Sequence, residues 1–293
     1  MNPFILLPEL SGALFLLVGL VAARRTWSRA SGLDKVIALG PVFVAAPLAT
    51  FGAEHMVSAR VIVQMVPAWM PARLFWAYFV GAALFATATS FVLRKRLRLS
   101  ATLYGLMILL FVLLLHVPNA VAHPVDRFAW AVALRDLTFG LGALAFAATQ
   151  TKEAREHGTK RLVAVIRMLV AIPLFFFAIE HFLHPEFAPG VPLPKLTPVW
   201  FPVRPLWGYA TGIVLFAAAA AFLLDRRART AAIGLGVWLA LLTAFLYLPF
   251  LAAADRASQA IEGPNYVADT LLFAGSMLLL AGASRPQPDT VVE

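Results

Sequence analysis

The chain has 293 residues, of which 61% are hydrophobic and only 13% charged, and it contains no cysteine. A soluble domain carries about 25% charged residues, so this composition excludes a soluble enzyme or a disordered chain and indicates a membrane protein without thiol or disulfide chemistry. The formal charge of +9 comes from short basic clusters between apolar segments, which is typical of membrane topology signals and argues against a nucleic-acid partner.

Nine apolar runs are long enough to cross a membrane as helices, for which about 20 residues are needed. Several runs are apolar on every face, which argues against membrane β-strands with their alternating pattern. The sequence therefore predicts an all-α polytopic membrane protein with nine transmembrane helices. They cover residues 4–23, 36–57, 74–93, 101–120, 128–150, 162–184, 204–224, 231–254 and 265–284.

Basic residues predict the orientation of the chain. The loops after odd-numbered spans carry 16 Lys and Arg, against six in the other loops. The positive-inside rule therefore places the N-terminus outside and the C-terminus in the cytoplasm. The first span contains Glu9 and is followed by Arg24 and Arg25, so we expect a retained helix rather than a cleaved signal peptide.

Part of the sequence recurs at an offset of 131 residues. Ten positions match in register within twenty residues, and several of them are the rare residues Trp and Pro, which shared apolar composition does not explain. The first copy holds Pro67, Trp69, Pro71, Arg73, Trp76, Tyr78, Gly81, Leu84, Phe85 and Ala86. The second holds Pro198, Trp200, Pro202, Arg204, Trp207, Tyr209, Gly212, Leu215, Phe216 and Ala217.

The duplication extends to the flanking spans. Glu54 and His55 match Glu180 and His181 at an offset of 126, and Asp136 matches Asp269 at 133. Each repeat holds four spans, so both copies keep one orientation. We expect an accessory helix (1–30), two parallel four-helix bundles packed side by side (31–155 and 156–284) and a cytoplasmic tail (285–293).

Four acidic residues inside spans are the candidates for catalytic proton transfer, because ionisable groups in a membrane are costly and mark functional sites. Glu54 and Glu180 each lie near the predicted outer end of a helix, seven residues after a proline that kinks the helix. Asp136 follows Arg135, a neighbour suited to an ion pair, whereas Asp269 follows an alanine. In the alternative interpretation, each Glu-His pair simply ends its helix at the lipid headgroups.

The residues around the glutamates are candidates for ligand binding. His55 and His181 follow them directly, but His184 has only a serine at the corresponding position of the first copy. We therefore predict no metal site. Arg73 and Arg204 lie at the same membrane level as the glutamates, so we expect each arginine to pair with Glu54 or Glu180.

Aromatic residues repeat in the outer loops and at the start of the following spans. One interpretation is the aromatic belt of a membrane interface. The other is a loop that folds back as a lid and presents a flat wall to a planar ligand. The residues are Trp69, Trp76, Tyr78, Trp200, Trp207 and Tyr209.

The four-span unit resembles the DoxX-like membrane proteins. The resemblance rests on the helix end at Glu54-His55, the Trp-x-Tyr-x-x-Gly opening at Trp76, the basic inner loop at residues 94–96 and the His-Val-Pro ending at His116. It implies a bacterial inner-membrane protein, in some cases an accessory subunit of quinone-linked oxidoreductase systems such as thiosulfate:quinone oxidoreduction. The chain departs from single-unit members in its double length and lack of cysteine.

Our leading hypothesis is a protein of the bilayer that binds a quinone-like, lipid-soluble ligand at outer-face sites, one per repeat, and serves a membrane redox partner. Glu54 and Glu180 would transfer protons, and the aromatic residues would line the ligand. One alternative is a small-solute transporter, and another is a non-catalytic scaffold that stabilises a partner complex.

Overall fold

The computed structural model describes residues 3–150, 157–190, 196–252 and 257–284. Within these ranges the chain is helical, with one isolated antiparallel bridge between Phe187 and Leu196. Nine helical stretches of this described part are long and apolar enough to cross a membrane, as the sequence predicts. The expected tail, 285–293, lies outside the described residues.

The first half of the chain forms five long helical stretches. The fourth is interrupted by a π-helical turn, because Pro118 lacks an N–H group and its ring crowds the carbonyl one turn earlier. The elements are α1 (Pro3–Arg29), α2 (Asp34–Ile37), α3 (Gly40–Val57), α4 (Ala59–Ile62), η1 (Val63–Met65), α5 (Arg73–Leu93), α6 (Leu97–Phe111), the π-turn η2 (Val112–His116), α7 (Val117–Ala122) and α8 (Arg127–Ala148).

The second half repeats this order without an additional first helix. A second π-turn precedes Pro249, as the first precedes Pro118. The elements are α9 (His157–Leu183), α10 (Arg204–Leu223), α11 (Ala228–Leu242), the π-turn η4 (Thr243–Tyr247), α12 (Leu248–Ala252) and α13 (Ala257–Ala283).

The backbone carries unusual conformations at matching places in the two halves. Among the described residues, six non-glycine residues have positive φ, and they form three pairs that are each 131 positions apart. The two π-turns, which begin at Val112 and Thr243, have the same spacing. Left-handed backbone is costly for residues with a side chain, so local sequence sets the same helix ends in both halves. The pairs are Ala72 with Val203, Arg94 with Asp225, and Arg96 with Arg227.

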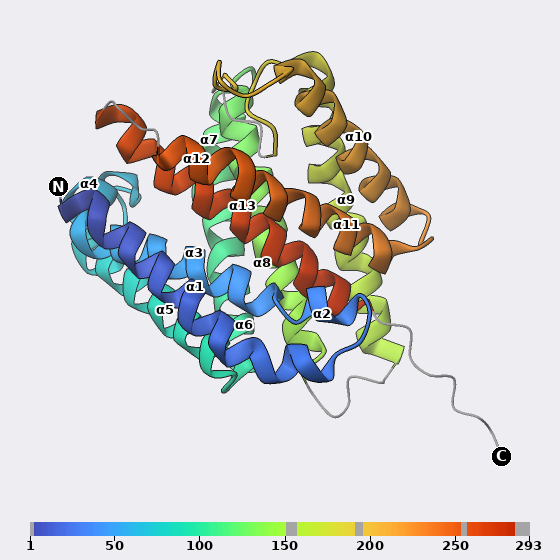
Figure 1. The fold of residues 1–293 in the computed structure, drawn as a ribbon. Coiled ribbons are helices and arrows are strands. Elements are labelled where there is room, and N and C mark those ends of the chain that lie inside the picture. Colours follow the sequence, from blue (N-terminus) through green and yellow to red (C-terminus); the bar gives the residue numbers. More distant parts are fainter. Residues whose placement is uncertain (1–2, 151–156, 191–195, 253–256, 285–293) are drawn as a thin grey trace.

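The halves interlock, so the expectation of two separate four-helix bundles side by side is wrong. The last helix of the second half, α13, packs mainly against α11, α3 and α8, and α8 packs in turn against α6 and α9. Figure 1 shows α13 in red passing between the layer of α1, α3 and α5 and the helices α9 to α11. Each half therefore places its fourth helix against the first helix of the other half.

Close backbone contact holds α13 against α3 and α8 in this arrangement. Gly275 of α13 lies against Phe43 and Val44 of α3, where a Cβ atom would come within 2.8 Å of backbone atoms. Gly142 of α8 lies similarly against Ser276 of α13, with 3.1 Å to its Cβ. Small residues allow such approaches in a membrane, where lipid is as apolar as the side chains and helix association depends on packing and polar contacts.

Helix α1 packs on the outside of the first half, against α3 and α5. Gly12 of α1 faces Thr50, and Gly19 faces Val42. Most of the apolar side chains of α1 are exposed in the isolated chain, among them Leu14, Leu17 and Val21. These side chains suit contact with lipid.

Candidate functional site

Arg135 and two aspartates form the most deeply buried group of charged side chains in the described structure. Arg135 Nε donates to Asp136 Oδ1 at 2.9 Å, and its Nη1 donates to Asp269 Oδ2 at 2.5 Å. The two aspartates are 8% and 6% exposed. The predicted ion pair between Arg135 and Asp136 is thus confirmed, and the same guanidinium also binds Asp269. One arginine from the first half compensates a carboxylate from each half.

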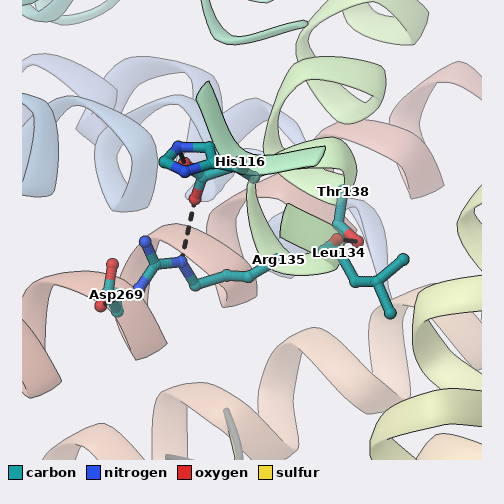
Figure 2. Close-up of polar contacts among 6 residues, drawn as sticks. His116, Leu134, Arg135, Thr138 and Asp269 are labelled. Atoms are coloured by element: carbon teal, nitrogen blue, oxygen red, sulfur yellow. Dashed lines mark hydrogen bonds and ion pairs between the residues drawn. The ribbon is translucent and has the colours of Figure 1, made fainter. Parts of the chain in front are cut away.

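His116 extends this cluster from the π-turn η2. Its Nε2 atom lies 3.1 Å from the second oxygen of Asp136. A π-turn widens the helix and changes the direction of its side chains, and such turns are frequent at functional sites. Figure 2 shows the Arg135 guanidinium extending between His116 and Asp269. The proline at position 118 therefore shapes the local helix that positions this histidine.

Glu54 lies at the end of α3 and is connected to the same helix as Asp269. With its amide nitrogen facing the carboxylate, Asn265 donates to Glu54 Oε1 at 2.5 Å and to Oε2 at 3.2 Å. Asn265 precedes Asp269 by one helical turn of α13, so both side chains project from the same side of that helix. We call Glu54, Asn265, Asp269, Arg135, Asp136 and His116 the Arg135 cluster.

Glu180, the counterpart of Glu54, has a different partner. Arg127, the first residue of α8, donates from Nη2 at 2.5 Å and from Nε at 2.6 Å to Glu180 Oε2. Glu180 is buried, whereas the Arg127 side chain is 40% exposed. This pair joins α8 to α9 and is a clasp between the two halves.

His181 is held by its own chain. Its Nδ1–H donates to the Phe177 carbonyl at 2.6 Å, so Nε2 is free to accept the Gly190 N–H at 2.9 Å. Gly190 has φ +120°, a conformation for which glycine is the suitable residue. His55 makes the corresponding bond to Phe51 at 2.8 Å.

The outer loop of the second half also contacts Tyr247, which stands at the position of His116. The Tyr247 hydroxyl donates to the Pro189 carbonyl at 2.6 Å. Its ring stacks on Tyr266 with 5.9 Å between centroids. The polar atoms of His181 and Tyr247 are therefore used by the Pro189-Gly190 peptide unit, and the two halves differ at this place.

The expected pairs of Arg73 with Glu54 and of Arg204 with Glu180 are wrong. Arg73 donates instead to the carbonyls of Val66 and Val63, each at 2.8 Å. Arg204 donates to the Thr197 carbonyl at 3.4 Å. Both arginines therefore fix the loops that precede α5 and α10. A shared membrane level does not bring the side chains together, because Glu54 contacts α13.

Four of the six aromatic candidates are exposed, and Trp76 and Trp207 are half-buried. Trp69 is 69% exposed, and Trp200, Tyr78 and Tyr209 are exposed as well. Trp76 Nε1–H donates to the Pro71 carbonyl at 3.0 Å, and the matching Trp207 donates to Pro202 at 2.9 Å. These contacts tie each outer loop to the following helix. None of the hydrogen bonds or ion pairs of the described residues joins these rings to Glu54 or Glu180.

Several members of the site were not candidates on the sequence. Arg127 is the first residue of α8 and Asn265 is the first residue of a predicted span, where polar residues are ordinary. Nothing in the sequence connects them to a glutamate 53 or 211 positions away. His116 stood out only as a possible metal ligand and as part of the family resemblance. The charged side chains also do not gather into a metal site, since no group of three suitable ligands occurs among the described residues.

Comparison with models of known protein families, with characterised proteins and with solved structures gives no match.

Proposed function

We propose that this chain is a DoxX-like protein of the bacterial inner membrane that binds a quinone-like, lipid-soluble ligand and serves a membrane redox system. The ligand site is the Arg135 cluster, the N-terminus faces outward, and a redox protein of the same membrane is the partner. The chain is a tandem duplication, which the matched positive-φ residues and π-turns support.

The observation that carries this proposal is the placement of acid and base groups with a single compensating arginine. Asp136 and Asp269 share Arg135, while His116 and Glu54 lie at the two ends of the cluster. Buried charges are expensive, and replacement by apolar residues is often neutral or stabilising. A cluster of this kind in a membrane is therefore a functional candidate rather than a requirement of the fold.

The residues present fit a neutral ligand that exchanges protons. A quinone, when bound, takes up two electrons and two protons, and the electrons come from the redox partner. Glu54 lies near the helix end and is held by a neutral amide, so it is placed to exchange a proton between the cluster and the membrane surface. His116 is placed to transfer a proton at Nε2, and Arg135 holds Asp136 and Asp269 in position.

Only one of the two expected sites is proposed to bind a ligand. In the second half, Glu180 is bound by Arg127, and His181 and Tyr247 bind the Pro189-Gly190 peptide unit. These side chains act as structural contacts between the outer loop, α9 and the π-turn η4. Glu180, His181 and Tyr247 of the second copy thus stabilise the protein, and the Arg135 cluster, which both halves form, carries the activity.

The test compares matched glutamate variants of the two halves. Wild type, Glu54→Gln, Asp269→Asn and Glu180→Gln are purified in mild detergent, and organic extracts are examined by mass spectrometry. We expect one quinone per chain in wild type and in Glu180→Gln, and a loss of quinone in Glu54→Gln and Asp269→Asn. Circular dichroism and size-exclusion chromatography verify that each variant is folded.

Two results would contradict the proposal. If the wild-type extract holds only bulk phospholipid, the protein binds no quinone-like ligand. That result would favour the scaffold hypothesis. Quinone retained in Glu54→Gln and lost in Glu180→Gln would place the site in the second half.

A small-solute transporter is the second candidate, because the Arg135 cluster lies at the contact between the two halves. Sites in transporters with repeats lie at such an interface, near the middle of the membrane. Asp136 is nine residues, or about 13 Å along the helix axis, from the start of α8. Solute uptake into proteoliposomes that is abolished by Asp136→Asn but unaffected by Glu180→Gln would favour transport over redox service.

A further inference from the structure

A buried tyrosine hydroxyl next to the Arg135 cluster lacks a partner. Tyr104 of α6 is 2% exposed, and its hydroxyl makes no hydrogen bond within the described residues. Burial of a hydroxyl without a partner is unfavourable, because the group loses its bonds to water and gains none. Tyr247 is equally buried, and its hydroxyl is satisfied by the Pro189 carbonyl.

The packing of α6 on α8 brings Tyr104 towards the cluster. The helices touch where Gly105 meets Gly140, and a Cβ on Gly105 would lie 3.0 Å from the Gly140 carbonyl oxygen. Tyr104 adjoins this crossing on α6, and Asp136 lies one turn from Gly140 on the facing antiparallel helix. The phenol is within electrostatic range of Asp136, Arg135 and Asp269. The unpartnered hydroxyl therefore lies close enough to the proposed site to interact electrostatically with its charged groups.

We infer that Tyr104 donates a hydrogen bond to a neutral oxygen atom that the chain itself does not supply, the carbonyl oxygen of the ligand. This inference rests on the proposed function and narrows the ligand to one that carries a carbonyl. The tyrosine hydroxyl is a donor, and the aspartate oxygens next to it already accept from Arg135 and His116. Tyr104 is thus a ligand-binding residue.

The charges of the site favour a neutral ligand. Asp136 and Asp269 share one arginine, and Glu54 adds a third carboxylate with only an amide partner. A carboxylate or phosphate at this place would meet like charges at low dielectric, which is strongly unfavourable. A ketone or quinone carbonyl accepts from the phenol without adding charge.

The same acceptor chemistry is available from a water molecule. A buried water needs two to four polar partners, and the Tyr104 hydroxyl with the Asp136 carboxylate would supply two. A water at this place would also accept from the phenol. The experiment must therefore separate a ligand carbonyl from a water oxygen.

The experiment compares Tyr104→Phe with Tyr247→Phe in the purified full-length chain. A benzoquinone with a decyl chain is titrated into each protein, and binding is followed by quenching of tryptophan fluorescence. We expect Tyr104→Phe to weaken binding about tenfold, the effect of one buried hydrogen bond, and Tyr247→Phe to leave affinity unchanged. With a ¹³C-carbonyl probe, the infrared carbonyl band should lie lower in wild type than in Tyr104→Phe.

Melting temperatures without added quinone complete the test. Unchanged affinity and carbonyl frequency in Tyr104→Phe would overturn the inference. If wild type binds no quinone but Tyr104→Phe melts lower, as Tyr247→Phe should, the oxygen belongs to water, and the proposed quinone function fails while the hydroxyl site stands. If wild type binds no quinone and Tyr104→Phe melts at the same or a higher temperature, the hydroxyl binds nothing and both fail.

Discussion

Arg135 and Asp269 are 134 positions apart in the chain and form an ion pair of 2.5 Å inside the membrane-spanning part of the structure. The pair joins α8 of the first half to α13 of the second. The Arg135 guanidinium also binds Asp136 at 2.9 Å. The charge balance of the interior therefore depends on contact between the halves, and neither half would carry it alone.

Removal of Arg135 should destabilise the protein strongly. Arg135→Gln leaves two buried carboxylates without a cation, a change that costs about 3–5 kcal/mol in comparable sites. The free energy of unfolding in mixed micelles measures the loss. The double variant Arg135→Gln/Asp269→Asn should lose less than the sum of the two single variants, because it removes one of the uncompensated charges. Strict additivity would show that the two side chains do not interact.

A methyl group at Gly275 should separate α13 from α3. In Gly275→Ala the new Cβ would lie 2.8 Å from backbone atoms of Phe43 and Val44. Such overpacking costs about 1–3 kcal/mol, which a thermal melt would detect. Gly234→Ala in α11 is the control, because nothing lies within 4 Å of its Cβ, and it should be neutral or slightly stabilising. Equal effects at both glycines would contradict the interlocked packing.

Trp76 of α5 and Trp207 of α10 should contribute equally to stability. Trp76→Phe and Trp207→Phe each lose the indole hydrogen bond to a proline carbonyl, with an expected cost of about 1 kcal/mol. Trp69→Phe, at an exposed ring, should cost little. The midpoint of thermal unfolding provides the comparison. If Trp76→Phe alone weakened quinone retention, that result would support the predicted role of this ring in lining the ligand.

The absence of cysteine allows a direct test of orientation. Val125→Cys and Lys95→Cys place single thiols in exposed positions at opposite ends of the helices. With a membrane-impermeant maleimide added to intact cells, Val125→Cys should be labelled and Lys95→Cys protected. After membrane disruption both should react, which shows that both thiols are accessible. The reverse pattern would invert the predicted topology.

The matched local features follow directly from the sequence. In each half a π-turn stands just before a proline, Pro118 or Pro249. The predicted ion pair of Arg135 with Asp136 involves adjacent residues, so it needs no knowledge of the packing. Arg73 and Arg204 illustrate the limit, because each has several possible acceptors at the same membrane level, and the outer loops provide them.

The sequence by itself determined the membrane class and the nine spans, because the thickness of the bilayer and the need to satisfy every backbone group permit little else for apolar runs of this length. Only the tertiary structure decided which helices meet. Apolar faces are equally suited to lipid and to any neighbouring helix, so hydrophobic periodicity does not indicate which helices pack together. The choice was made by close backbone contact, such as that at Gly275, which placed α13 beside α3 and α8 and brought Asp269 to Arg135 and Asn265 to Glu54.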